Sequence, residues 1–325
     1  MKPTTESEYM PEKGPEISVI LIDGSFRESC HAVEFFEKQK ISRREYEIIW
    51  VEYYERTNSE LKKQLLEYEN LKIVELGKSG IYHSSLCFNR GIMESRGRII
   101  VIADGDTVVE EDFLDQVRKE HKRNDELVMY VFRFDEPEQE PKGRSRVDLN
   151  NLRKICRLVN PSNYGACLTV RKQWLLSING YEEHPFFGTG FHANGLDVYT
   201  RLKNLGLSIK WHPDLRIYHP WHPLTLSNAS VYELQHMIIE HRAITLSTLP
   251  FCGIYSDKNS EIPGSLSRRL NEVIREKELA SSLGLPCEVA YDDRGANNGP
   301  HNSLREFGGL MKRIGRRFSS CIRRY

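Results

Sequence analysis

The chain has 325 residues, 39% hydrophobic and 28% charged, which suffices for one large α/β domain with an appendage or for two domains. Lysine plus arginine equals aspartate plus glutamate at 46 each, so no overall field favours nucleic acid as a partner. No signal-peptide core and no bilayer-length apolar run occurs, so we expect a cytoplasmic protein. The seven cysteines lack paired spacing, which predicts free thiols rather than disulfides or a zinc cluster.

Strands and helices alternate after a polar N-terminal tail of residues 1–15. Apolar runs predict strands, and apolar positions at helical spacing or turn-bounded polar segments predict helices. The expected elements are a strand at 17–22, a helix to about residue 40, a strand at 46–51, a helix at 61–68, a strand at 71–76, a helix at 82–96 and a strand at 99–103. This alternation predicts a parallel, doubly wound sheet. Residues 135–146 are expected to form an exposed loop or lid.

Two carboxylates follow the strand at 99–103. That run is apolar without alternation, as in a central strand buried on both faces, and Asp104 and Asp106 stand one residue apart at its end. Ligands of parallel sheets bind at the carboxyl ends of the strands. Two carboxylates flanking a glycine can share a divalent cation with a nucleotide diphosphate. The alternative for this tripeptide is a solvated Asp-Gly-Asp turn.

Residues 16–223 carry five ordered motifs. They are residues 17–21, Gly80 through Asn89, Arg90 and Gly91 ahead of Gly97, Asp104-Gly105-Asp106, residues 165–171 with Gly180-Tyr181-Glu182-Glu183, and Leu196-Asp197 with Arg201, Leu202 and Gly206. With these motifs the chain resembles glycosyltransferases of family 2. The resemblance implies an α/β GT-A fold, with a Rossmann-like, mostly parallel sheet flanked by helices. It also implies a nucleotide-sugar donor, bound Mg²⁺ or Mn²⁺, and inversion at the anomeric carbon.

The metal ligands follow from this resemblance. It implies that Asp106 is a direct ligand, and that Asp104 contacts ribose or binds the metal through water. A histidine completes the metal shell in related enzymes, and His219 is the first candidate here, with His222 in reserve. Glycosyl transfer leaves a nucleoside diphosphate, whose growing negative charge a cation neutralises. A packed or solvated imidazole is the alternative role for His219.

A donor pocket is expected at the ends of the first two strands. The candidate contacts to the nucleotide sugar are Asp23, Glu52, Gly80, Arg90 and Asp104. Phe26 could stack on a base or pack beneath its helix, and Lys78 and Arg90 could meet the diphosphate or remain solvated. The segments after both strands depart from the family pattern, so UDP-linked and GDP-linked donors both remain open.

The catalytic base is the least defined part of the expected site. An inverting enzyme needs a base within reach of the acceptor hydroxyl. The Glu-Asp pair that supplies it in the family falls on Asn194-Gly195, which leaves Asp197 as the nearest acid. We predict Asp197 and His192 as the catalytic residues, with Glu183 as a substitute base. Asp197 could also cap the helix that follows it.

Beyond residue 225 the resemblance ends. Residues 226–302 are predicted to be a helical extension of the 16–225 glycosyltransferase domain, with helices at 231–249 and 266–279 and a linker at 292–302. Residues 303–325 project as a basic amphipathic helix, which would lie on an anionic membrane surface. A tail docked on the protein or plain disorder are the alternatives.

The sequence thus predicts a metal-dependent, inverting glycosyltransferase, cytoplasmic and peripheral to the membrane. It would move a sugar to a glycan or lipid-linked acceptor in surface polysaccharide or glycolipid synthesis. The alternatives are a catalytically silent subunit that binds a sugar nucleotide or glycan, and a sugar-phosphate nucleotidyltransferase. The latter class should carry an early glycine-rich phosphate loop, which residues 23–27 fit poorly.

Overall fold

The structure is a computed structural model and describes residues 14–24, 29–54, 59–68, 71–138, 147–188, 193–222 and 231–276. The chain divides into two units, Met1–Val289 and Ala290–Tyr325. All of the described residues lie in the first unit. The predicted N-terminal tail, the 292–302 linker and the basic tail helix fall mostly or wholly outside them, so the predicted domain boundaries stay predictions.

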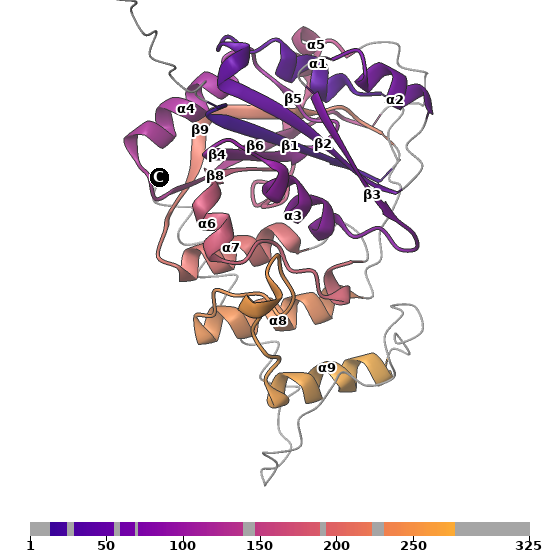
Figure 1. The fold of residues 1–325 in the computed structure, drawn as a ribbon, viewed down its shortest axis with the longest axis vertical. Helices are drawn as coiled ribbons and strands as arrows, with labels where there is room; N and C mark the ends of the chain where they lie inside the picture. The colour runs from indigo at the N-terminus through magenta and orange to yellow at the C-terminus, as the bar shows by residue number, and fades with distance from the viewer. Residues whose placement is uncertain are drawn as a thin grey trace, which may run out of the picture. The chain divides into compact units, whose positions relative to one another are not determined.

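Within the described residues the core is one sheet of nine strands (Figure 1). Its order is β3 (Leu71–Lys78), β2 (Tyr46–Tyr54), β1 (Ile17–Asp23), β4 (Ile99–Asp104), β8 (Cys167–Arg171), β6 (Leu127–Asp135), β9 (Ser208–His219) and β5 (Val108–Val109), with β7 (Arg157–Leu158) beside β6. Strands β1 to β4, β6 and β9 run in one direction, whereas β5, β7 and β8 run in the other. The sheet is therefore mostly parallel, as predicted, with antiparallel strands confined to its second half.

Helices cover both faces of the sheet because the central strands are apolar on both sides (Figure 1). In β1, Val19 and Leu21 enter one core cluster, and Ile20 and Ile22 enter the other. The helices that contribute to the first cluster are α1 (His31–Glu37), α2 (Ser59–Leu65) and α4 (Phe113–Arg123). Those that contribute to the second are α3 (Ser84–Glu94), α6 (Lys172–Ser177) and α7 (Asn194–Asn204).

The remaining helices extend these layers. They are α5 (Leu149–Ile155), which packs near β5 and β9, α8 (Tyr232–Thr245) and α9 (Gly264–Glu276), and the short 3-10 helices η1 (Arg43–Glu45), η2 (Pro185–Phe187) and η4 (Ser256–Lys258). Helix α8 contacts α7 on one side and α9 on the other. The predicted helical extension thus packs on the helical layer beneath the sheet (Figure 1). No helix in the described part of the chain has the length and apolar character needed to cross a membrane.

Two predicted boundaries were wrong for physical reasons. The segment expected to be a loop from residue 135 begins inside the sheet, because β6 continues to Asp135 in register with β9. The helix predicted to run to residue 249 ends at Thr245, where Leu246 adopts a left-handed conformation with φ of 55°. The other elements that the sequence analysis predicted, including α1, which stops at Glu37, begin and end within a few residues of their expected positions.

Candidate metal and donor site

The Asp104-Gly105-Asp106 turn is brought beside the end of β9 by a short strand. The turn closes when the Thr107 amide donates to the Asp104 carbonyl (3.0 Å), and β5 follows at once. Strand β5 pairs antiparallel with β9, with Val108 opposite Tyr218. Because the next residue of β9 is His219, this pairing sets the histidine against the turn.

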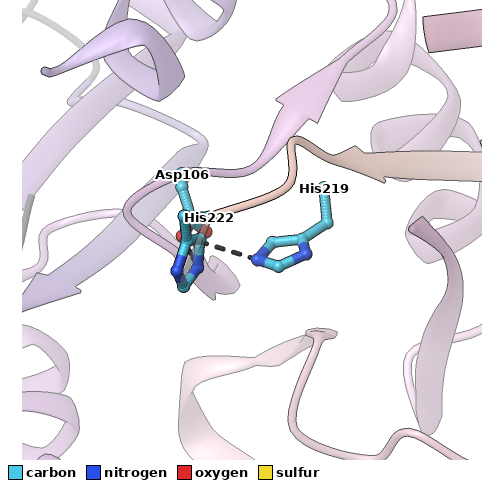
Figure 2. Close-up of side chains that lie close together, drawn as sticks. All are labelled: Asp106, His219 and His222. Atoms are coloured by element: carbon cyan, nitrogen blue, oxygen red, sulfur yellow. Dashed lines mark ion pairs between the residues drawn. The ribbon is translucent and has the colours of Figure 1, made fainter. Parts of the chain in front are cut away.

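Asp106, His219 and His222 form one cluster, named here the histidine cluster (Figure 2). Asp106 Oδ2 lies 3.6 Å from His219 Nε2 and 3.2 Å from His222 Nε2. The three potential ligand atoms all lie within 4.8 Å of one another. Asp106 is 4% exposed, whereas the side chain of His222 is 43% exposed. The cluster is thus anchored in the protein on one side and open on the other.

Backbone and side-chain contacts hold this geometry. The Glu136 amide donates to the His219 carbonyl (3.0 Å), and the Glu136 carboxylate accepts a hydrogen bond from the Trp221 amide (2.9 Å). On the other side, His31 Nε2 donates to the Asp106 carbonyl (2.9 Å). The segment that carries both histidines is therefore fixed between β6 and the Asp106 turn.

The electrostatics of the cluster favour a cation. Burial lowers the pKa of His219, but hydrogen bonds with Asp106 and Asp135 outweigh it and raise the pKa to about 9. At neutral pH the imidazolium of His219 therefore supplies positive charge beside Asp106. A divalent cation can take the place of that proton, since imidazole nitrogen and carboxylate oxygen are both metal ligands.

The donor set fits a metal ion, with one carboxylate and two imidazoles converging. Among the described residues, this is the only cluster of three or more His, Cys, Asp and Glu side chains that lie close enough together to hold an ion. Asp104 does not belong to it. Arg133 Nη1 lies 3.7 Å from Asp104 Oδ2 instead. His222, the reserve candidate from the sequence, joins the cluster alongside His219.

Asp23 and Glu52 lie at the same edge of the sheet as Asp104. They are opposite each other in the pairing of β1 with β2, and Ile22 is opposite Asp104 in the pairing of β1 with β4. Asp23, Glu52 and Asp104 thus lie at or near the ends of neighbouring strands, at the carboxyl edge where parallel sheets bind their ligands. Both Asp23 and Glu52 are fully buried, and their contact with a donor stays a prediction.

The loop at Gly80 is held by β2. Gly80 has φ of +82°, and its carbonyl accepts a hydrogen bond from Tyr54 Oη (2.9 Å), while the Ile81 carbonyl accepts one from Tyr53 Oη (2.8 Å). A positive φ favours glycine at this turn. The structure therefore fixes the loop at the edge where donor contacts are predicted.

Arg90 is not brought to this edge. Its side chain is 52% exposed and pairs with Glu94 at the far end of α3, and Glu94 in turn pairs with Lys72 near the start of β3. The start of α3, at Ser84, follows the Gly80 loop, and six residues of helix place Arg90 about 9 Å further along. Its predicted contact with the donor therefore has no support in this geometry.

Asp197 belongs to a buried set of charges, named here the arginine cluster, which consists of Glu182, Asp197, Arg201 and Arg242. Asp197 Oδ2 accepts from Arg201 Nε (2.8 Å), Asp197 Oδ1 accepts from Arg242, and Arg242 also donates to Glu182. All four side chains are 0 to 1% exposed. Burial raises the pKa of Asp197, but Arg201 and Arg242 outweigh it and lower the pKa below its usual value.

This placement bears on the predicted base. A base must reach the acceptor hydroxyl with a free lone pair, whereas both oxygens of Asp197 are occupied by arginines inside the protein. We therefore assign Asp197 a structural role in the first turn of α7 and do not retain it as the base. His192 and Phe26 lie outside the described residues.

The start of α7 explains the missing acid pair. A Cβ at Gly195 would lie 2.4 Å from the Tyr164 carbonyl oxygen, so a carboxylate side chain does not fit there. The neighbouring Asn194 is 6% exposed and donates to Ser84 Oγ (2.7 Å). The helix thus begins by packing closely on the chain before β8, without an acid at its first turn other than Asp197.

Glu183 is a half-buried carboxyl on the segment before η2. Burial raises its pKa, and the hydrogen bond that Asn89 Nδ2 donates to Oε1 (2.7 Å) offsets this only in part. A carboxylate with a raised pKa suits proton abstraction near neutral pH. Glu183 therefore remains a candidate base among the described residues.

Sequence reasoning missed Arg133, Asp135 and Glu136. Asp135 Oδ1 lies 3.1 Å from His219 Nδ1 and 2.9 Å from Arg133 Nε. These residues were assigned to a loop or passed over because β6 was not predicted as a strand. The signal was present, because an apolar and aromatic run at residues 127–134 ends in an acid, as the run before Asp104 does.

The fold is similar to crystal structures of TarS from S. aureus. For TarS 1–349 in complex with UDP the TM-score is 0.51 at 12% identity, with 82% of this chain and 71% of that chain covered. For TarS 1–349 in complex with UDP-GlcNAc it is 0.51 at 13% identity, with 82% and 73% covered. The chain spans 43% of a longer TarS structure, at a TM-score of 0.52. Neither a protein-family model nor a curated protein sequence matches the chain.

At this identity the likeness shows the fold alone. The chain has a GT-A-like glycosyltransferase fold, a mixed α/β sheet flanked by helices, as the sequence predicted.

Proposed function

We propose that this protein is a metal-dependent, inverting glycosyltransferase of the family 2 type. It uses a nucleotide-sugar donor, UDP-linked in the first instance, and a glycan or lipid-linked acceptor. The UDP preference is supported by the similar fold of TarS, which was crystallised with UDP and with UDP-GlcNAc.

One observation carries the proposal. Asp106 of the β4 turn converges with His219 and His222 at the carboxyl edge of a sheet whose fold is GT-A-like. A structural role would be satisfied by burial and saturated pairing, as in the arginine cluster. An acid flanked by two imidazoles, one of them exposed, is instead suited to bind a cation.

The residues of this chain have distinct tasks in the proposed reaction. Asp106, His219 and His222 hold Mg²⁺ or Mn²⁺, which when bound supplies electrostatic stabilisation for the departing diphosphate. Asp23, Glu52 and the Gly80 loop line the nucleoside end of the donor. The acceptor proton passes to Glu183 or His192.

The experiment measures release of UDP from UDP-GlcNAc and other UDP- and GDP-sugars, with Mn²⁺, with Mg²⁺ and with EDTA. We expect turnover that needs the metal and is lost in Asp106→Asn. Asp214→Asn, a change at an exposed aspartate of β9, is the matched control and should keep wild-type turnover. Product stereochemistry determined by NMR tests inversion.

The base is tested by Glu183→Gln. If Glu183 is the base, the change lowers kcat by 10²-fold or more, in the range typical of general-base catalysis, and leaves donor binding intact. Wild-type kcat in Glu183→Gln moves the assignment to His192. Turnover that is equal with Mn²⁺ and with EDTA contradicts the metal-dependent reaction.

The second candidate is a catalytically silent subunit that binds a sugar nucleotide. It is favoured by Gly195, where the backbone of Tyr164 excludes the acid that family 2 enzymes use. This candidate predicts metal-dependent binding of UDP-sugars by calorimetry with no UDP release under any of the conditions above. Binding with release contradicts it.

The predicted attachment to a membrane belongs to residues 303–325, which lie outside the described residues. We propose that this basic segment brings the enzyme to a lipid-linked acceptor. Cosedimentation with anionic and neutral vesicles tests it, comparing the full chain with a chain ending at residue 302. Equal binding of both chains to anionic vesicles would contradict the role of the segment.

A further inference from the structure

The two nitrogens of the His219 ring face two different carboxylates. Nε2 lies 3.6 Å from Asp106 Oδ2 in the histidine cluster, and Nδ1 lies 3.1 Å from Asp135 Oδ1 on the opposite side of the ring. Asp135 stands directly beside His219 in the parallel pairing of β6 with β9. The backbone register of the sheet therefore fixes this pair of side chains.

The two nitrogens of the His219 ring can take different roles, one carrying a proton and the other binding a metal. A neutral imidazole carries one proton, and the other nitrogen has the lone pair that binds a metal. An ionised carboxylate only accepts hydrogen bonds, so when a cation replaces the proton on the Asp106 side, Asp135 keeps the remaining proton on Nδ1. In that form the lone pair of Nε2 points to Asp106, where a cation would sit.

Arg133 ties the pair to the other acid of the Asp-Gly-Asp turn. Its Nε lies 2.9 Å from Asp135 Oδ1, and its Nη1 lies 3.7 Å from Asp104 Oδ2. All three side chains are partly buried, at 19 to 29% exposure, so these ion pairs are shielded in part from water. Arg133 therefore holds the Asp135 carboxylate at the place where it faces His219 Nδ1.

Resting on the proposed function, we infer that Asp135 is a positioning residue for the metal site and acts through His219. It sets the tautomer and the ring orientation of His219, and Arg133 holds Asp135 in place for this task. Partners of this kind, which contact a metal ligand and not the metal, are a common source of metal affinity.

The test measures Mn²⁺ affinity by calorimetry, without donor or acceptor. Asp135→Leu removes the acceptor at similar volume, and we expect a 10- to 100-fold weaker Kd, as is typical when such a partner is lost. Asp135→Asn keeps an acceptor oxygen without its charge, and a smaller loss is expected. Asp214→Asn is the matched control and should bind as wild type.

A double-mutant cycle separates positioning from a general structural effect. Because Asp135 acts through His219, Asp135→Asn should cost nothing further in a His219→Gln background, while it keeps its full effect in a His222→Gln background. A second readout is the tautomer of His219 in the protein loaded with diamagnetic Zn²⁺, observed by ¹⁵N NMR. We expect the proton on Nδ1.

Three results would overturn the inference. They are wild-type Mn²⁺ affinity in Asp135→Leu, additive losses in the His219→Gln background, and a proton on Nε2 in the Zn²⁺-loaded protein. These outcomes are separable from the proposed function. Metal binding that depends on Asp135 without any sugar transfer would refute only the transferase, and transfer with unchanged affinity in Asp135→Leu would refute only the positioning role.

Discussion

The histidine cluster and the arginine cluster both centre on an aspartate that the sequence predicted to be functional, Asp106 as a metal ligand and Asp197 as the catalytic base, yet the two clusters differ in charge balance. In the arginine cluster, two carboxylates meet two guanidiniums and nothing is exposed. In the histidine cluster, Asp106 meets two imidazoles, whose charge depends on protons, and His222 reaches solvent. An aspartate paired with arginines, which stay charged, has a structural role. An aspartate paired with histidines can bind a metal ion, because the histidines can lose a proton and become metal ligands.

The largest expected effect lies in the arginine cluster. Arg242→Met should lower the free energy of unfolding by about 3 to 5 kcal/mol, because it leaves the charge of Glu182 buried without its main partner. Urea unfolding measures this, with Arg123→Met, a change at a 73% exposed side chain, as control. A loss below about 1 kcal/mol would show that the cluster is not structural and would reopen the role of Asp197.

The histidine cluster should show itself as a pH dependence of stability in the metal-free protein. The pKa of His219 rises from 6.5 to about 9 on folding, which corresponds to about 3 kcal/mol. Because the folded pKa is the higher one, this contribution is fully present below pH 6.5 and is lost as the pH rises through 9.

Urea unfolding in EDTA at several pH values from 6 to 9.5 measures this loss. His219→Gln should remove most of the difference between the two ends of the range, and the same change at His241, on α8, should not. An unchanged slope in His219→Gln would contradict the pairing of His219 with Asp106 and Asp135.

Close packing at the start of α7 explains why Asp197 is the only acid in the first turn of this helix. Gly195→Ala should destabilise the protein by about 1 to 3 kcal/mol, because its Cβ would overlap the Tyr164 carbonyl. Gly165→Ala is the matched control, since its Cβ would meet nothing nearer than 3.7 Å. Equal thermal stability of both variants would mean that the site has room for a side chain.

The smallest effect is expected at the open side of the histidine cluster. His222→Gln should weaken Mn²⁺ binding about tenfold, a loss no larger than that typical for an outer partner of a metal ligand, because water can replace an exposed ligand. Calorimetry compares it with His219→Gln, for which a greater loss is expected. The reverse order would make His222 the principal histidine.

The sequence was sufficient to predict the first half of the fold. Apolar strands without alternation, each followed by a helix, predict a parallel sheet from local sequence alone. The Asp-Gly-Asp turn marks the edge of that sheet where a ligand is expected. The second half was harder because β9, although it is 12 residues long, carries many polar residues, and β6 was missed altogether. Missing β6 also meant missing Asp135, Arg133 and Glu136.

The sequence by itself thus determined the class of fold, the position of Asp104 and Asp106, and the presence of histidines near the end of the fold. Only the tertiary structure decided which of these meet. The β5–β9 pairing joins Asp106 to His219 and His222 across more than a hundred residues, and the packing of α8 on α7 gives Asp197 to Arg242. Whether an aspartate has a structural or a chemical role depends on the charged side chains that distant segments place beside it. The sequence of a single strand or helix does not show which side chains these are.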